Sequence, residues 1–170
     1  FWPEFQPYWN VLFPKEKHVC LDFPPIDGER FSHLGPLHEI AWMHRGRYNG
    51  LICDSWREDV DIFEIANGAI EAAKAAPGLK WHFYAMETGQ DGRLRPCWEI
   101  LIDALRRMDA LGEVCGRMDN MDHVYRSMDF VLTPHHIVTR VIGEALSCGT
   151  PVIAAEGCRA TPYTADPSCP

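Results

Sequence analysis

DFVLTPHHIVTRVIGEALSCGTPVIAA, residues 129 to 155, is the stretch that decides the fold of this chain. Its pattern predicts a short apolar strand at Phe130 to Leu132, a helix that begins near Thr139, and a second apolar strand at Val152 to Ala155. Apolar side chains recur through the helix at the spacing of one helical face, and Gly149 stands where a left-handed C-cap belongs. Together these elements indicate a βαβ unit.

In a βαβ unit of this kind, the N-terminus of the helix is suited to bind an anion. Two parallel strands joined by a right-handed crossover bring the C-terminal end of the first strand beside the N-terminus of the helix. Backbone N–H groups there have no partner within the helix, and together with the helix dipole they favour an anion. We therefore expect a phosphate-bearing ligand at this helix end, where Thr139 is the candidate N-cap.

Composition and charge set limits on the class of protein. The chain has 170 residues, enough for one α/β domain with its own core but not for a second complete domain. Its 16 basic and 24 acidic residues give a formal charge of -8, which argues against nucleic-acid or anionic-membrane binding by the whole surface. We find no Cys-x-x-Cys pair, transmembrane run or signal peptide, and we expect reduced thiols in a cytoplasmic protein.

The chain divides near residue 45. Residues 1 to 45 are dense in aromatic side chains and prolines, and we expect this segment to pack on the rest of the domain or on a missing neighbour. From residue 46 to 170, apolar strands alternate with helices, which predicts a Rossmann-like three-layer α/β domain with a mainly parallel sheet. The start at Phe1 and the loop-like tail indicate a fragment of a longer chain.

Three helices before the decisive stretch have specific expected faces. The helix expected at 59 to 78 should bury Ile62, Phe63, Ala66, Ile70 and Ala73. The helix expected from residue 97 should bury Trp98, Leu101, Leu105 and Met108, with Gly112 just beyond its end. A short helix after Asn120 should bury Tyr125 among its apolar residues.

Two segments near the C-terminus match a family pattern. They are YRSMDFVLTP at 125 to 134 and EALSCGTPVIA at 144 to 154, and in this order they resemble the C-terminal, donor-binding half of a group 1 retaining GT-B glycosyltransferase. The resemblance implies a Rossmann-like domain that binds a nucleotide diphosphate sugar at the carboxyl ends of its strands. It also implies an N-terminal domain that holds the acceptor, without which the isolated domain should not turn over.

The resemblance carries over to individual residues of the loop and the helix. Glu144 matches the second glutamate of the family's E-x7-E pattern, which implies that its carboxylate accepts hydrogen bonds from the donor ribose. His136 replaces the other glutamate, so the match places it near the transferred sugar, at the catalytic position. Thr139 and Arg140 belong to the residues that replace the family's glycine-bearing stretch, whose amides engage the phosphates, and Arg140 offers charge to the diphosphate.

Other parts of the family's donor site are less complete. The family has an arginine and a lysine after the first strand, but here only Arg57 matches and no lysine follows. The missing cation should lower the rate of sugar transfer unless Arg140 or Arg45 compensates. Gly116 and Arg117 lie on the loop that is expected to border the nucleotide base of the donor. Arg117 is either a contact of this ligand or an ordinary surface residue.

These departures leave three functions open. One is retaining transfer of a sugar from a nucleotide diphosphate sugar, with no cofactor besides this donor substrate. Another is a degenerate domain that binds a nucleotide sugar or a partner protein without catalysis, and a third is a GT-B nucleotide-sugar epimerase, which the sequence matches less closely. We expect no metal, because His135 and His136 have no acidic or cysteine partner nearby and the family's chemistry does not use one.

Overall fold

The structure is a computed structural model of the chain, and it describes residues 26–34, 45–53, 62–86, 94, 96–133 and 139–154. The elements within these ranges are β1 (Tyr48–Cys53), α2 (Ile62–Ala75), β2 (Leu79–Tyr84), α3 (Pro96–Arg107), β3 (Leu111–Val114), α4 (Met121–Arg126), β4 (Phe130–Leu132), α5 (Arg140–Ser147) and β5 (Val152–Ile153). None of the helices described has both the length and the apolar content needed to cross a membrane.

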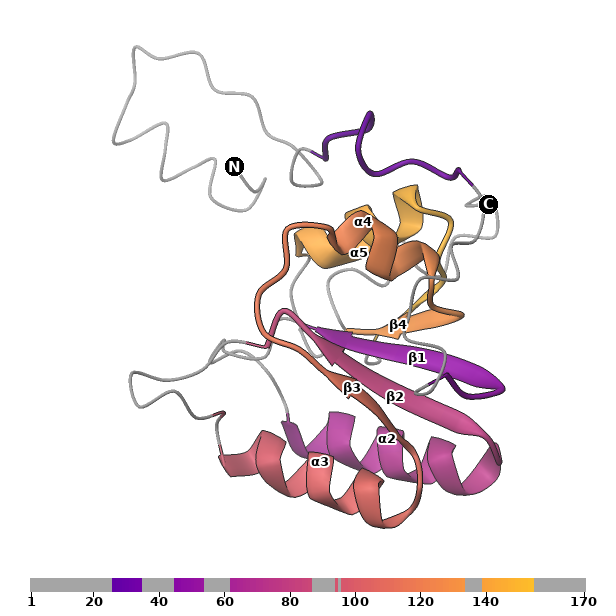
Figure 1. The fold of residues 1–170 in the computed structure, drawn as a ribbon, viewed down its shortest axis with the longest axis vertical. Coiled ribbons are helices and arrows are strands. Elements are labelled where there is room, and N and C mark those ends of the chain that lie inside the picture. The colour runs from indigo at the N-terminus through magenta and orange to yellow at the C-terminus, as the bar shows by residue number, and fades with distance from the viewer. Residues whose placement is uncertain are drawn as a thin grey trace, which may run out of the picture.

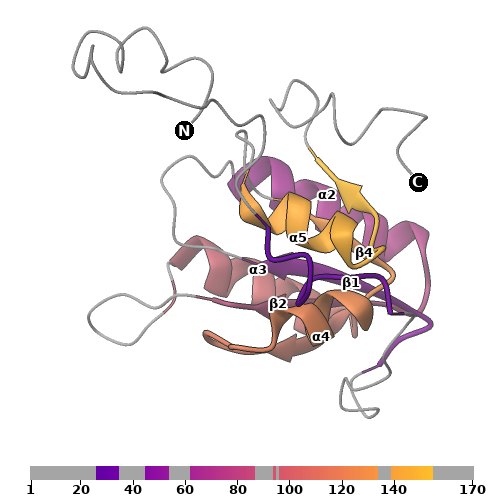
Figure 2. The same cartoon turned by 90° about the horizontal axis from the view of Figure 1, so that it is seen from above.

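Strands and helices alternate along the chain and build three layers. The five strands form one sheet in the order β3-β2-β1-β4-β5, and every neighbouring pair is parallel. Helices α2 and α3 cover one face of the sheet and α4 and α5 cover the other (Figure 1). In the view from above, α4 and α5 lie on the near side of the sheet (Figure 2). The predicted Rossmann-like α/β class is therefore confirmed.

The central strand β1 is buried on both sides, as expected for a parallel sheet between helices. Its side chains alternate between two cores: Leu51 and Cys53 belong to the core under α4 and α5, and Ile52 belongs to the core under α2 and α3. The second core is dense in aromatic rings, since Trp81 meets Phe130 edge to face with 5.4 Å between ring centroids.

The predicted βαβ unit is present in the structure. Strand β4 covers Phe130–Leu132, helix α5 begins at Arg140 with Thr139 in the N-cap position, and Gly149 has a φ of 79° just after the helix. A residue with a side chain would be strained at that φ, which explains the glycine. Most of residues 1–45 lies outside the described ranges, so the division of the chain near residue 45 stays a prediction.

The predicted buried face of α2 is wrong at Phe63, whose side chain is 78% exposed. Ile65 and Ala69 are the fully buried residues of this helix. Because successive residues of a helix are about 100° apart, Phe63 and Ile65 point to nearly opposite sides, and burying one exposes the other. The apolar residues of α2 are too evenly spread for the sequence alone to choose between these two faces.

The predicted end of α3 is also wrong. The helix ends at Arg107, Met108 is exposed, and the turn uses Asp109 at a φ of 54°. Gly112 lies inside β3, where an added Cβ would come within 2.5 Å of the ring of His82. This glycine therefore allows a close approach between neighbouring strands and is not a helix cap.

Candidate functional site

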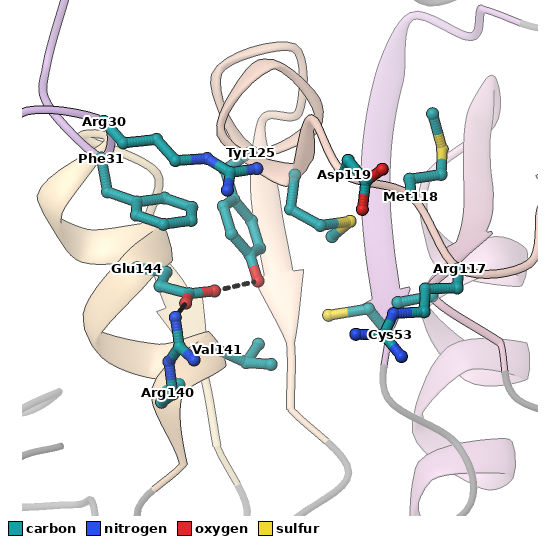
Figure 3. Close-up of a pocket in the computed structure, with 12 residues that line it drawn as sticks. Arg30, Phe31, Cys53, Arg117, Met118, Asp119, Tyr125, Arg140, Val141 and Glu144 are labelled. Carbon is teal, nitrogen blue, oxygen red and sulfur yellow. Dashed lines mark hydrogen bonds and ion pairs between the residues drawn. The ribbon is translucent and has the colours of Figure 1, made fainter. Parts of the chain in front are cut away.

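A cavity of about 460 Å³ opens at the edge of the sheet where the strands end (Figure 3). Three of its lining residues follow successive strands: Cys53 ends β1, Ala85 comes directly after β2, and Arg117 lies on the loop after β3. Helix α4 and the first turns of α5 close the other walls. This is the edge at which open parallel sheets bind their ligands.

The N-terminus of α5 carries unused hydrogen-bonding capacity. Thr139 occupies the N-cap position with extended backbone, but its side chain makes no capping hydrogen bond. The side chain is buried, and Oγ1 has no hydrogen-bond partner in the part of the chain that the structure describes. Since a buried hydroxyl without a partner is costly, this helix end is suited to receive a ligand acceptor such as a phosphate oxygen.

Glu144 lies one turn into α5 and is held from two sides. Arg140 Nη2 lies 2.8 Å from its Oε1, and the Tyr125 hydroxyl of α4 lies 3.2 Å from its Oε2 (Figure 3). The side chain lines the cavity although the residue is only 8% exposed, so it is not a solvated helix residue. Each carboxylate oxygen has two lone pairs, so each retains capacity to accept a ligand hydroxyl.

Burial dominates the electrostatics of this carboxylate. It raises the pKa of Glu144 above its ordinary value, against the opposing effects of the Arg140 ion pair, the Tyr125 hydrogen bond and the charge of Arg30. Burial, followed by the nearby Cys53 and Glu144, also raises the pKa of Tyr125 well above its ordinary value. At neutral pH the tyrosine hydroxyl is therefore protonated and donates to the carboxylate.

The cavity is locally richer in positive charge than the chain as a whole. Arg30, Arg117 and Arg140 line it, opposed by the carboxylates of Asp119 and Glu144. Sequence reasoning missed Arg30, because it belongs to the N-terminal segment that was expected only to pack. No local motif marks it, and the pairing that brings it to the cavity joins positions 92 residues apart.

Several of the predicted site residues come together and others do not. Glu144, Arg140 and Arg117 line the cavity, and Thr139 occupies the N-cap position of the helix beside it. Gly116 is exposed on the same loop as Arg117 but does not line the cavity.

Two of the other predicted residues, His136 and Arg57, lie outside the described residues. Arg45, which together with Arg140 could compensate for the missing cation, precedes β1 and does not line the cavity.

The cysteines and potential metal ligands form no special centre in the described ranges. Cys53 and Cys148 are buried and Cys97 and Cys115 are partly buried, all four as free thiols. No group of three or more histidine, cysteine, aspartate or glutamate side chains within those ranges is placed to hold a metal ion.

Solved structures similar to the chain include three that cover most of it. Pneumococcal O-GlcNAc transferase GtfA, in complex with UDP and GlcNAc, has 15% identity and a TM-score of 0.59 over 90% of the chain. The C-terminal domain of the glycosyl transferase group 1 family protein LpcC from Francisella tularensis has 19% identity and a TM-score of 0.56 over 79%. Sucrose-phosphate synthase from Thermosynechococcus elongatus has 15% identity and a TM-score of 0.64 over 98%.

These similarities establish the fold. No protein-family model and no curated protein sequence matches the chain. The chain spans 28% of the length of the GtfA structure, 72% of the LpcC domain and 42% of the sucrose-phosphate synthase. It thus has the fold of one Rossmann-like half of a GT-B protein, the fold class that the sequence predicts.

Proposed function

We propose that the chain binds a nucleotide diphosphate sugar in this cavity, as the donor-binding domain of a retaining, hexosyltransferase-like glycosyltransferase. The observation that carries the proposal is Glu144, a buried carboxylate aimed into a cavity at the carboxyl ends of the strands. A carboxylate with spare acceptor capacity suits two neighbouring hydroxyls of a ribose. In this proposal a separate N-terminal domain binds the acceptor, as the resemblance in sequence implies.

The cavity offers a distinct group for each part of such a donor. Glu144 takes the ribose, and the N-terminus of α5 with Thr139 and Arg140 takes the diphosphate. Arg117 and the backbone at Gly116 border the base. The resemblance in sequence assigns His136 to the sugar and Arg57 to the phosphates.

Transfer of the sugar leaves a nucleoside diphosphate with added negative charge on its leaving oxygen. Positive groups and oriented N–H groups that already point at this position stabilise the charge without reorganising. Arg140 and the first turn of α5 supply such groups in this proposal. The cytoplasm is the proposed location, because the cysteines of the described ranges are free thiols.

A non-catalytic nucleotide-sugar-binding domain is the second candidate function. Arg140 is already paired with Glu144 at 2.8 Å, and His136 replaces the glutamate of the family pattern, so both features weaken the case for transfer. A nucleotide-sugar epimerase matches the sequence less closely. The transferase and the non-catalytic binding domain would use the same donor cavity, so binding is tested first and transfer second.

The binding test is calorimetric titration of the 170-residue chain with UDP-, GDP- and ADP-sugars. We expect saturable heat with one of them, and at least about tenfold weaker binding by Glu144→Gln, since a charged acceptor is lost. Glu99→Gln is the matched control, because Glu99 is an exposed residue of α3 away from the cavity. No saturable heat with any donor refutes the proposal, and equal affinity in Glu144→Gln removes this residue from the site.

The transfer test uses a longer chain that includes the N-terminal domain. Release of nucleoside diphosphate that depends on an acceptor supports transfer, whereas tight binding without release supports the non-catalytic candidate. His136→Glu restores the family's carboxylate in that protein. Unchanged activity and donor preference in this variant would show that the position is not part of the catalytic site.

A further inference from the structure

Arg30 is delivered to the cavity by a fixed turn of the N-terminal segment. Asp27 Oδ1 accepts hydrogen bonds from the backbone N–H groups of Glu29 and Arg30 at 3.1 and 3.2 Å. The backbone N–H of Phe31 donates to the Asp27 carbonyl at 2.8 Å. Asp27 therefore holds the backbone around Arg30 in one conformation, with its side chain on the N–H groups of Glu29 and Arg30 and its carbonyl on that of Phe31.

Phe31 anchors this turn on the domain. Its side chain is only 4% exposed, and its ring lies 6.1 Å from the ring of Tyr125. Residues 26–34 run over the side of the sheet that carries α4 and α5 (Figure 1). Arg30 and Phe31 thereby become part of the same cavity wall as Tyr125 and Glu144 (Figure 3).

The guanidinium of Arg30 is held in one orientation but keeps hydrogen-bond donors available. Its Nε lies 3.4 Å from Asp122 Oδ1, and its central carbon lies 5.1 Å from the Phe31 ring centroid. The two terminal nitrogens have no ion pair with any of the described residues, and the side chain is 43% exposed. Because a guanidinium carries five N–H donors in a rigid fork, holding Nε leaves the terminal pair for another anion.

Arg140, the other arginine beside Glu144, has a different ion-pair partner. Arg140 pairs through Nη2 with the Glu144 carboxylate at 2.8 Å, so a phosphate that drew this nitrogen away would leave the buried carboxylate without its ion pair. Arg30 acts on the same carboxylate only through its charge, which lowers the Glu144 pKa. Arg30 can serve a phosphate through its terminal nitrogens while its Nε stays on Asp122 and Glu144 keeps its ion pair with Arg140.

We propose that Arg30 is a phosphate-binding residue of this cavity, which contacts the diphosphate of the bound nucleotide sugar through its terminal nitrogens. The inference rests on the proposed function. It supplies the cation that the sequence lacks after its first strand, where Arg57 has no lysine partner. Asp122 acts as the positioning residue that orients the guanidinium.

The test compares two arginines in similar surroundings. Arg47 also lies over the ring of the next residue, with 5.3 Å to the Tyr48 centroid, but it precedes β1 at the other edge of the sheet. UDP, GDP and ADP are titrated into the wild-type chain, and the tightest binder is carried forward with its nucleoside. We expect Arg30→Ala to weaken binding of the nucleoside diphosphate about tenfold and to leave binding of the nucleoside unchanged. Arg47→Ala should change neither affinity.

The outcomes separate this inference from the proposed function. Equal weakening of diphosphate and nucleoside by Arg30→Ala indicates a structural role and overturns the inference. Wild-type affinity for the diphosphate in Arg30→Ala also overturns it, while the Glu144 result still stands. If the wild-type chain binds none of the three diphosphates, the proposed function fails as well. Arg30→Gln, which keeps much of the side-chain length, checks that any loss comes from the charge, and a melting curve checks that each variant is folded.

Discussion

The Tyr125 hydroxyl lies 3.2 Å from Glu144 Oε2, so a buried hydrogen bond joins α4 to α5 at the wall of the cavity. Tyr125 also packs its ring against Phe31 of the N-terminal segment. One core residue thus touches the two groups that the cavity presents to a ligand, the Glu144 carboxylate and the turn that carries Arg30. Packing and binding are coupled at this position.

Tyr125→Phe removes the hydroxyl and keeps the ring. We expect the free energy of unfolding at about pH 7 to fall by about 1 kcal/mol, because Oε2 of a buried carboxylate loses its neutral donor. The loss should shrink at a pH below the unfolded value of Glu144, near 4.5, where the carboxyl is protonated in both states. Urea unfolding at both pH values measures this, with exposed Tyr48→Phe as the control. An equal loss of unfolding free energy at both pH values would contradict the role assigned to the hydrogen bond.

Glu144→Gln tests the cost of burying the carboxylate. Burial raises the folded-state pKa of Glu144 above its unfolded value of 4.5. The stability that this group contributes is therefore fully present below that value and is lost as the pH rises through the folded pKa. Since glutamine does not titrate, the unfolding free energy of the variant minus that of wild type should increase from about pH 4 to about pH 7. A decrease over this range would mean that the folded pKa is depressed.

Local signals explain what could be predicted from the sequence. The strand at Phe130–Leu132, the helix after Thr139 and the cap at Gly149 follow from apolar spacing and from a glycine at positive φ. The burial of Tyr125 was predicted in the same way, but its hydrogen bond to Glu144 was not. That contact depends on how α4 packs on α5.

The features that were not predicted depend on contacts between distant parts of the chain. Phe63 is exposed because tertiary packing chose the other apolar side of α2. Gly112 is a strand residue because the ring of His82 occupies the space its side chain would need. Arg30 reaches the cavity because it pairs with Asp122, a partner 92 positions away, and sequence patterns carry no record of such a pairing.

A pair of glycine variants tests the packing of the sheet. An alanine Cβ at Gly112 would lie 2.5 Å from the His82 ring, so we expect Gly112→Ala to lower the free energy of unfolding by about 1–3 kcal/mol. Gly68 lies inside α2 with nothing within 4 Å of an added Cβ, and Gly68→Ala should raise stability by about 0.5–1 kcal/mol. Thermal or urea unfolding checks both. Effects of the same sign in the two variants would contradict this account.

The central claim is that the cavity between α4 and α5 binds a nucleotide diphosphate sugar through Glu144. The most direct test is an experimental structure of the chain with that ligand or its nucleoside diphosphate bound. Our account predicts ribose hydroxyls within hydrogen-bonding distance of Glu144, and a diphosphate between the N-terminus of α5 and the guanidinium of Arg30. A nucleotide bound elsewhere, or one whose ribose does not contact Glu144, would contradict it.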